Sequence, residues 1–143
     1  MSGGDPPVTL MAFDYGERRI GVAVGQTITR SASPLAIIAM RDGRPEWEAL
    51  SRLVQQYAPE LMVVGLPSHA DGNPHPLASR VERFCNQLRE RYRVPVQTVN
   101  ERLSSHEARA RMGTEGQAVD ALAAQVILET WLNENRPAQE SGR

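Results

Sequence analysis

Apolar and polar positions near the start of the chain predict three strands. Residues 8–14 and 19–25 are mostly apolar, and the polar segment 15–18 separates them. Two apolar runs joined by a tight turn are typical of a β-hairpin. A third apolar run, residues 35–40, is predicted as the next strand. The Asp-Gly pair at 42–43 then interrupts the pattern, as a turn would.

The rest of the chain alternates between helical and strand patterns. Apolar residues recur at helical spacing over 47–57, and Pro45 suits the first position of that helix. The apolar run at 61–65 predicts a short strand that is buried on both faces. The further predicted elements are helices over 77–93 and 104–112, a helix that opens at 114–117, and a strand over 94–99.

The order of these elements, β-β-β-α-β-α-β-α-α, predicts an α/β fold in which helices pack on a mixed sheet. We expect the two crossover strands to join the sheet in parallel, through right-handed connections. With 143 residues, the chain suits one domain, residues 1–143. Its ends, residues 1–7 and 136–143, are rich in glycine, proline or polar residues and are predicted to be flexible.

Composition narrows the class of protein. Hydrophobic residues make up 41% of the chain and charged residues 23%, as in an ordinary soluble protein. No apolar run approaches the ~20 residues of a membrane span, so we expect no membrane partner. The single cysteine, Cys85, excludes an internal disulfide and a cysteine-based zinc site. A reducing, cytoplasmic location is therefore expected.

Charge is nearly balanced overall but uneven along the chain. The net charge of −1 creates no general field that would attract nucleic acid. All 16 basic residues are arginine. Codon bias explains this composition, but arginine side chains can also form forked hydrogen bonds with phosphate. Residues 80–111 hold eight arginines against four glutamates. Arg80 and Arg83 lie off the apolar stripe of their predicted helix, either as part of a phosphate track or as a solvated face.

Three carboxylates stand at informative positions. Asp14 interrupts the first strand, Glu101 follows the last predicted strand, and Asp120 lies in the second turn of the last helix. Ligands gather at strand ends in open α/β sheets. Turn chemistry, an ion pair and solvation are the simpler explanations for the three acids taken singly. If they meet, their charges need a compensating cation, and carboxylate oxygens suit Mg²⁺ or Mn²⁺.

Four segments carry a recognisable series of motifs. They read FDYGERRIGVAV at 13–24, VVGLP at 63–67 with Asp-Gly at 71–72, ERLSSHEA at 101–108, and DALAA at 120–124 with Ile-Leu at 127–128. Together they cover roughly residues 8–133, and in this order they resemble the YqgF/RuvX family of RNase H-like nucleases.

The resemblance implies an RNase H-like fold with a mixed five-stranded sheet, order 3-2-1-4-5, flanked by helices. It implies a divalent-metal-dependent nuclease associated with 5′-end processing of pre-16S ribosomal RNA. A Holliday-junction resolvase acting on branched DNA is the alternative within the family. By motif match, Asp14, Glu101 and Asp120 take the places of the catalytic carboxylates and metal ligands. Asn100 stands where the family often has aspartate, and we interpret it as a supporting residue rather than a ligand.

The implied chemistry is phosphodiester hydrolysis with Mg²⁺ or Mn²⁺. Two ions about 3.5–4 Å apart can make a water more acidic and hold the departing 3′ oxygen. This mechanism predicts products with 5′-phosphate and 3′-hydroxyl ends.

Several polar residues beside the expected site are candidates for substrate binding. They are Arg18, Arg19, His69 and Arg102, each with solvation as the simpler interpretation. Asp71 is either a turn residue or a fourth metal ligand. The segment 110–119 is shorter and less basic than in the family, so it indicates little about how substrate is held.

Two other function classes are open. Actin-like ATPases share an opening Asp-x-Gly hairpin, but they need a far longer chain and a second phosphate loop. A non-catalytic RNA-binding module is the stronger alternative, although all three acidic positions are intact. RNA is the favoured partner, and structured or branched DNA is the alternative. Contacts with the 2′-hydroxyl would decide between them, and the sequence does not identify such contacts. Both a monomer and a homodimer are open.

Overall fold

The computed structural model describes residues 8–66, 78–100 and 116–135, with residues 100 and 116–120 described by their backbone. Six strands form one sheet in the order β4-β3-β2-β1-β5-β6. The strands are β1 (Thr9–Tyr15), β2 (Arg19–Gln26), β3 (Ser31–Arg41), β4 (Arg44–Pro45), β5 (Leu61–Leu66) and β6 (Val96–Asn100). The helices are α1 (Trp47–Tyr57), α2 (Ala78–Tyr92) and α4 (Gly116–Glu134).

The first two strands form the predicted antiparallel hairpin, with Asp14 opposite Gly21 and Tyr15 opposite Ile20. The turn between them depends on Gly16. A Cβ atom at this position would lie 2.8 Å from the carbonyl oxygen of Arg19, closer than real Cβ contacts. The glycine therefore permits the tight return that brings β2 back beside Asp14.

Strand β3 is longer than predicted, because it begins at Ser31 and contains Pro34. Pro34 lies next to a register shift in β2, between Val22 and Ala23. Because β4 pairs with β3 only at Met40 and Arg41, β3 is an edge strand at Pro34, which is where sheets accept proline.

The Asp42-Gly43 break is a two-residue hairpin rather than the approach to a helix. Both residues have positive φ, 53° and 75°, as the turn that joins twisted strands requires. Pro45 belongs to β4, paired with Met40, so its prediction as the first helical residue is wrong. Helix α1 begins two residues later, at Trp47.

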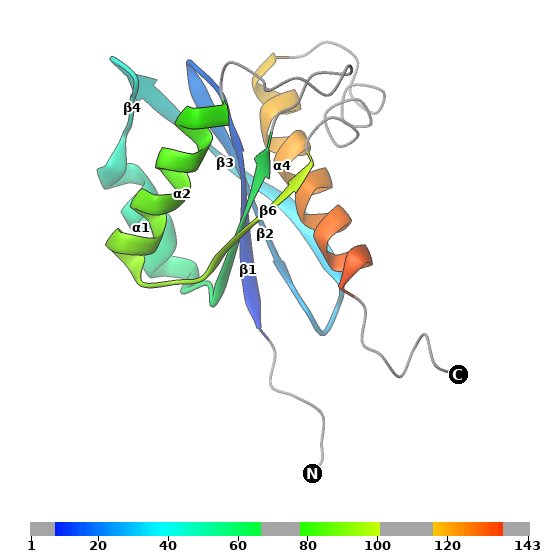
Figure 1. The fold of residues 1–143 in the computed structure, drawn as a ribbon. Helices are drawn as coiled ribbons and strands as arrows, with labels where there is room; N and C mark the ends of the chain where they lie inside the picture. The colour runs from blue at the N-terminus through cyan, green and yellow to red at the C-terminus, as the bar shows by residue number, and fades with distance from the viewer. Residues whose placement is uncertain (1–7, 67–77, 101–115, 136–143) are drawn as a thin grey trace.

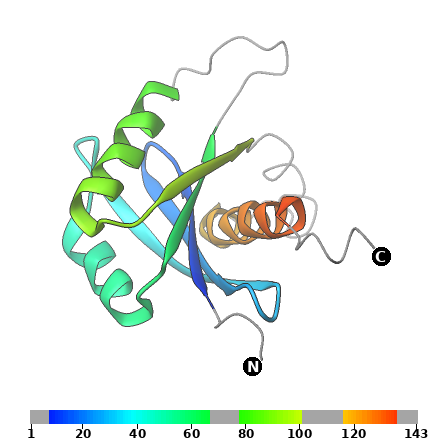
Figure 2. The same cartoon turned by 60° about the horizontal axis from the view of Figure 1, so that its bottom comes forward.

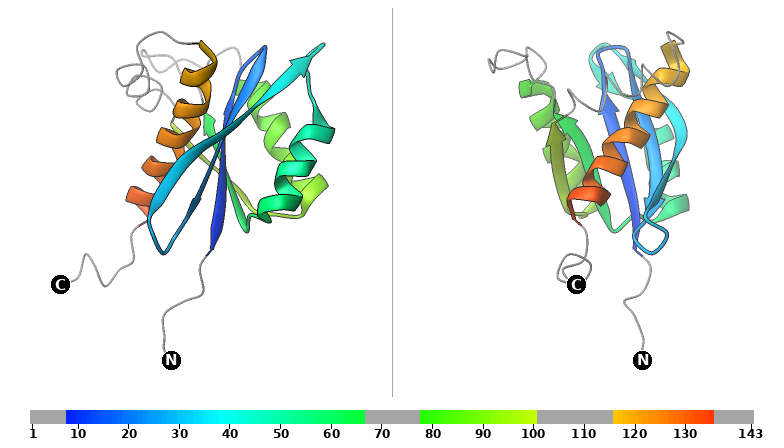
Figure 3. Two further views of the ribbon diagram at one scale, coloured as in Figure 1. Left: turned by 180° about the vertical axis from the view of Figure 1, so that it is seen from behind. Right: turned by 90° about the vertical axis from the view of Figure 1, so that its right-hand side faces the viewer.

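Helices cover both faces of the sheet (Figures 1 and 2). Helices α1 and α2 lie on one face, and α4 crosses the other face over β1, β2 and β3. Figure 3 shows this three-layer arrangement from behind and from the side. The strands β1, β5 and β6 run parallel, so their carboxyl ends share one edge of the sheet. This edge is the one where we expected ligands.

Side chains of β1 alternate between two cores. Met11 and Phe13 pack with α1 and α2, in a cluster built around Phe84. Leu10 and Ala12 pack on the opposite face with α4. Both sides are fully buried, which explains why β1 is a nearly continuous apolar run.

The RNase H-like fold and the predicted strand order are confirmed, with six strands in place of five. The added strand, β4, has two residues and extends the β3 edge. The helix predicted over 104–112 lies outside the described residues. None of the helices in the described ranges is long and apolar enough to cross a membrane.

Candidate active site

Asp14 is buried next to the carboxyl end of β1. Its exposed fraction is 9%, and no other charged residue in the described part of the chain is buried. Because Leu10 and Ala12 face α4, the strand alternation places Asp14 on the same face. A buried carboxylate costs free energy unless a partner compensates its charge, so this position favours chemistry over packing.

The end of β6 reaches the level of Asp14 on the same face. Phe13 pairs with Val64 on β5, and Gly65 pairs with Val99 on β6, so Val99 lies at about the level of Asp14. Val99 belongs to the core cluster on the α4 face. Two strand spacings separate β1 from β6, which is roughly 10 Å. Glu101 follows two positions after Val99 in the sequence and lies outside the described residues.

Helix α4 brings the backbone of Asp120 to this end of the sheet. Asp120 lies in the second turn of α4, which begins at Gly116. The N-terminal end of α4 and the carboxyl ends of β1 and β6 lie at the same end of the molecule (Figure 1). The backbone thus brings α4 near Asp14 from a distant part of the sequence. The meeting of all three carboxylates stays a prediction, since the side chain of Asp120 is not described.

The close approach of α4 to the sheet depends on Gly25 in β2. A Cβ atom there would lie 3.0 Å from Cδ2 of Leu128 and would also collide with the backbone of Ser31. One turn further along α4, the guanidinium of Arg30 donates a 3.1 Å hydrogen bond to the carbonyl oxygen of Leu132. These contacts fix the position of α4 on the sheet.

The predicted substrate-binding residues divide into two groups. Arg18 is exposed in the β1–β2 turn, and Arg19 is half-buried at the start of β2, both beyond the edge where β1 ends. His69, Asp71 and Arg102 lie outside the described residues. Within the described side chains, no three potential metal ligands come together.

Tyr15, which the sequence pattern assigned to the turn, is the last residue of β1. It follows Asp14 but points to the opposite face, where it packs against Phe84 with ring centroids 5.2 Å apart. Burial raises the pKa of the Tyr15 hydroxyl above its ordinary value, and the nearby guanidinium groups of Arg80 and Arg83 oppose that rise. The period-two alternation after Phe13 was the available signal for this placement.

A hollow of about 720 Å³ opens beside Tyr15, on the α2 side of the sheet. Its lining includes Arg80 and Arg83, together with Arg44 and Arg91, which the sequence pattern did not mark as candidates. Arg44 reaches the hollow through the two-residue strand β4, an element that the sequence pattern did not predict.

Comparison with known sequences identifies the family. The family model described as "RuvX: Holliday junction resolvase" matches residues 8–134. A protein of Hydrogenovibrio crunogenus named "Putative pre-16S rRNA nuclease" is 47% identical over 124 residues, covering 87% of this chain and 92% of that protein. A protein of Azotobacter vinelandii with the same name is 46% identical over 139 residues, covering 92% of this chain and 97% of its own.

Comparison with solved structures supports the same fold. The fowlpox virus Holliday junction resolvase aligns with a TM-score of 0.55 and 12% identity, over 90% of this chain and 100% of its own. Thermus thermophilus RuvC in complex with a Holliday junction aligns with a TM-score of 0.51 and 17% identity, over 89% and 94%. At these identities the likeness concerns the fold alone. Since the family model spans most of the chain and close relatives share nearly half of its residues, this protein belongs to the RuvX family.

Proposed function

We propose that this protein is a nuclease that hydrolyses phosphodiester bonds during 5′-end processing of pre-16S ribosomal RNA. The relatives that carry this name are 46–48% identical over 87–92% of the chain. The observation that carries the proposal is the buried Asp14, on the face and at the edge of the sheet that the N-terminal end of α4 approaches.

Asp14, Glu101 and Asp120 are the proposed catalytic carboxylates and metal ligands. Asp14 is a buried carboxylate, and a set of three carboxylates offers the hard oxygen donors that Mg²⁺ and Mn²⁺ prefer. The donor set therefore fits a divalent ion. When bound, such ions supply Lewis acidity toward the phosphoryl group and lower the pKa of water.

The residues around these acids bind and orient the substrate in this proposal. Arg18 and Arg19, at the turn beyond Asp14, would hold phosphate oxygens through forked hydrogen bonds. His69 and Arg102 complete the proposed substrate-binding set by their positions in the family motifs. The expected products carry 5′-phosphate and 3′-hydroxyl ends.

A Holliday-junction resolvase acting on branched DNA is the second candidate. The description of the matching family model favours it. This activity needs two sites that cut two strands symmetrically, so it implies a homodimer, whereas trimming an RNA end requires a single site.

The decisive experiment compares Asp14→Asn with the wild-type protein on four labelled substrates: a precursor 16S 5′ end, single-stranded RNA, single-stranded DNA and a four-way DNA junction. In Mg²⁺ or Mn²⁺, we expect the wild type to cleave the RNA precursor and the variant to lose at least about 100-fold in rate. The loss follows because Asp14 is a proposed ligand of the ion that assists the reaction. EDTA should abolish cleavage by the wild type.

A charge-matched control is Glu134→Gln, an exposed residue at the opposite end of α4. It should cleave at the wild-type rate. Mg²⁺ or Mn²⁺ should also raise the thermal midpoint of the wild type and of Glu134→Gln, but not of Asp14→Asn, because a ligand that binds the folded state stabilises it. Full activity of Asp14→Asn, or products ending in 2′,3′-cyclic phosphate, would refute the proposal. Binding without cleavage by the wild type would instead favour the RNA-binding module.

A further inference from the structure

The hollow beside Tyr15 is strongly basic. Four arginines line it, Arg44 from β4 and Arg80, Arg83 and Arg91 from α2, and Asp42 is the one carboxylate among the described lining residues. The net charge of these lining residues is therefore +3, within a volume of about 720 Å³. The whole chain carries a net charge of −1, so this concentration of positive charge is local rather than general.

The positive charge of the hollow is not cancelled by ion pairs with described residues. Two ion pairs in the described ranges, Arg41 with Glu46 and Arg52 with Glu48, lie outside the lining. Glu82 and Glu90 are on α2 but do not line the hollow with its arginines. Glu17 is another carboxylate near Tyr15, and its charge raises the pKa of the Tyr15 hydroxyl. The guanidinium groups are therefore available to an anionic ligand.

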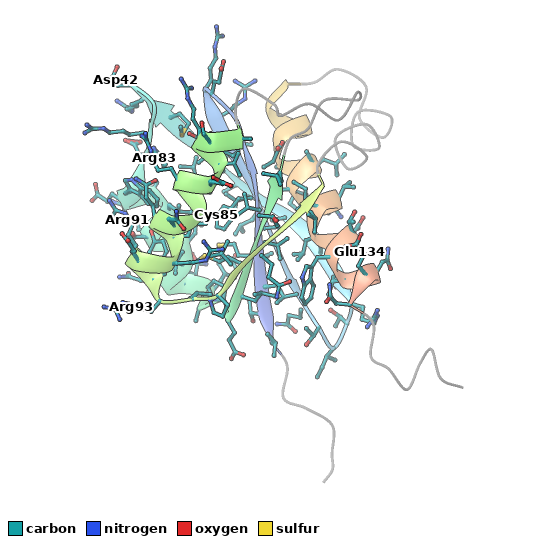
Figure 4. All side chains as sticks on the ribbon, viewed as in Figure 1. Asp42, Arg83, Cys85, Arg91, Arg93 and Glu134 are labelled. Atoms are coloured by element: carbon teal, nitrogen blue, oxygen red, sulfur yellow. The ribbon has the colours of Figure 1, made fainter. Side chains whose placement is uncertain are left out.

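Aromatic packing orders one wall of the hollow. Trp47 stacks on Phe84 with ring centroids 5.9 Å apart, and the guanidinium carbon of Arg91 lies 4.0 Å from the centre of the Trp47 ring. The β3–β4 turn forms the opposite rim at Asp42 and Gly43. Figure 4 shows Asp42, Arg83 and Arg91 on the same side of the molecule. A preformed site loses little conformational entropy when a ligand binds.

The hollow lies beside the same end of β1 as Asp14, on the opposite face of the sheet. Tyr15 lines it and is the residue directly after Asp14. From Arg80 to Arg91, α2 spans eleven residues, which is roughly 16 Å of helix. Successive phosphates of one stacked strand are spaced by about 3.4 Å along the axis, so the arginines cover about five nucleotides.

We propose that this basic hollow, defined by Arg44, Arg80, Arg83 and Arg91, binds the phosphodiester backbone of the nucleic-acid strand that extends from the cleavage site. This inference rests on the proposed nuclease function for its orientation: a strand leaving the catalytic acids would cross the end of β1, between Asp14 and Tyr15, to reach the hollow. The occupant is a polyanionic strand of about five nucleotides, held by charge and by forked hydrogen bonds rather than by base identity.

The test measures binding without cleavage, in the Asp14→Asn background, by fluorescence anisotropy of labelled RNA at several salt concentrations. The variant is Arg80→Gln/Arg83→Gln, and the charge-matched control is Arg52→Gln/Arg93→Gln. Arg93 lies beyond the far end of α2, and Arg52 is exposed on α1. Glutamine keeps a good helix propensity, and equal thermal midpoints would establish that both proteins are folded.

We expect the hollow variant to weaken binding at least about 10-fold and to reduce the slope of log affinity against log salt by about 1.4. The control should change the dissociation constant less than about twofold. Lengthening the RNA from two to eight nucleotides should strengthen its binding to the Asp14→Asn protein. The gain should be far smaller in the protein that also carries Arg80→Gln/Arg83→Gln. In a Trp131→Phe protein, RNA should also change the fluorescence of Trp47, which lines the hollow.

Equal weakening by the variant and the control, or identical length dependence in both, would overturn the hollow as the binding site. The cleavage assay on otherwise wild-type protein separates the two proposals. If cleavage occurs but does not depend on Arg80 and Arg83, the nuclease assignment holds and the hollow proposal fails. If binding depends on the hollow but no metal-dependent cleavage occurs, the hollow proposal holds and the nuclease assignment fails.

Discussion

Asp14 and Tyr15 are adjacent in sequence but serve opposite faces of the sheet. Asp14 lies on the α4 face, whereas Tyr15 packs against Phe84 under α2 and lines the basic hollow. The alternation of a single strand thus places a carboxylate and a phenol on two sides of the same edge. A substrate that occupies the hollow would pass this edge to reach the proposed catalytic acids.

Tyr15 gives a prediction about alkaline pH. Burial raises the pKa of Tyr15 above its ordinary value of 10.0, and burial also raises the pKa of the Cys85 thiol above 9.0. The folded protein therefore keeps these protons to higher pH than the unfolded chain. Since the unfolded chain loses them first, the free energy of unfolding should fall as pH rises above about 9 to 10.

The measurement is urea unfolding of the wild type and of Tyr15→Phe between pH 8 and pH 11. The fall above pH 10 should be smaller in Tyr15→Phe, because that ionisation is absent. The chain contains no lysine, so no ammonium group titrates in the same interval. An identical pH dependence in both proteins would show that Tyr15 is not the group responsible.

At the scale of elements, the position of α4 decides whether the site can exist. This helix carries apolar residues in the core cluster with β1, β5 and β6, among them Ile127, Leu128 and Leu132. Its contact with β2 depends on the absence of a side chain at Gly25. A shift of α4 would move its second turn, which contains Asp120, relative to Asp14.

Gly25→Ala is therefore predicted to destabilise the protein by about 1–3 kcal/mol, as overpacking does in a well-packed core. The added methyl group would press on Leu128 and on the backbone of β3. A matched control is Gly43→Asn, because Asn tolerates a positive φ and a Cβ atom at Gly43 meets nothing within 4 Å.

Urea midpoints of the two variants provide the comparison. If Gly25→Ala and Gly43→Asn unfolded at the same urea concentration as the wild type, close packing at Gly25 would be unimportant. Cleavage by Gly25→Ala should also decrease more than its stability alone explains, because α4 carries a proposed catalytic residue.

At the scale of the whole molecule, one sheet joins two separate cores. The first lies between the sheet and helices α1 and α2, and the second lies between the sheet and α4. The two tryptophans of the chain divide between them: Trp47 packs with the first core and Trp131 with the second. Because β1 contributes to both cores, we propose that the chain unfolds as one domain.

Single-tryptophan proteins test this proposal. Trp47→Phe reports on the α4 side through Trp131, and Trp131→Phe reports on the other side through Trp47. Urea unfolding followed by fluorescence and by circular dichroism should give coincident transitions within each protein, as a two-state transition does. A fluorescence midpoint that precedes the dichroism midpoint would indicate that one side separates first: the α4 side in Trp47→Phe, or the α1 and α2 side in Trp131→Phe.

Much of the fold could be predicted from the chain itself because its signals are local. Alternation and apolar runs marked the strands, helical spacing marked α1 and α2, and the motif series indicated the RNase H-like strand order. The errors occurred where a pairing partner decides the outcome. Pro45 joins a strand because Met40 pairs with it, and β3 extends over Pro34 because its other side is open there.

The sequence by itself determined which residues are candidates for chemistry, because an acid that interrupts an apolar strand is visible without a structure. Only the tertiary structure decided that Asp14 is buried on the α4 face, that the first turns of α4 approach that edge, and that arginines of β4 and α2 share one hollow. The physical reason is that sheet pairing and helix packing bring together residues separated by tens of positions, and their proximity depends on contacts that no local pattern records.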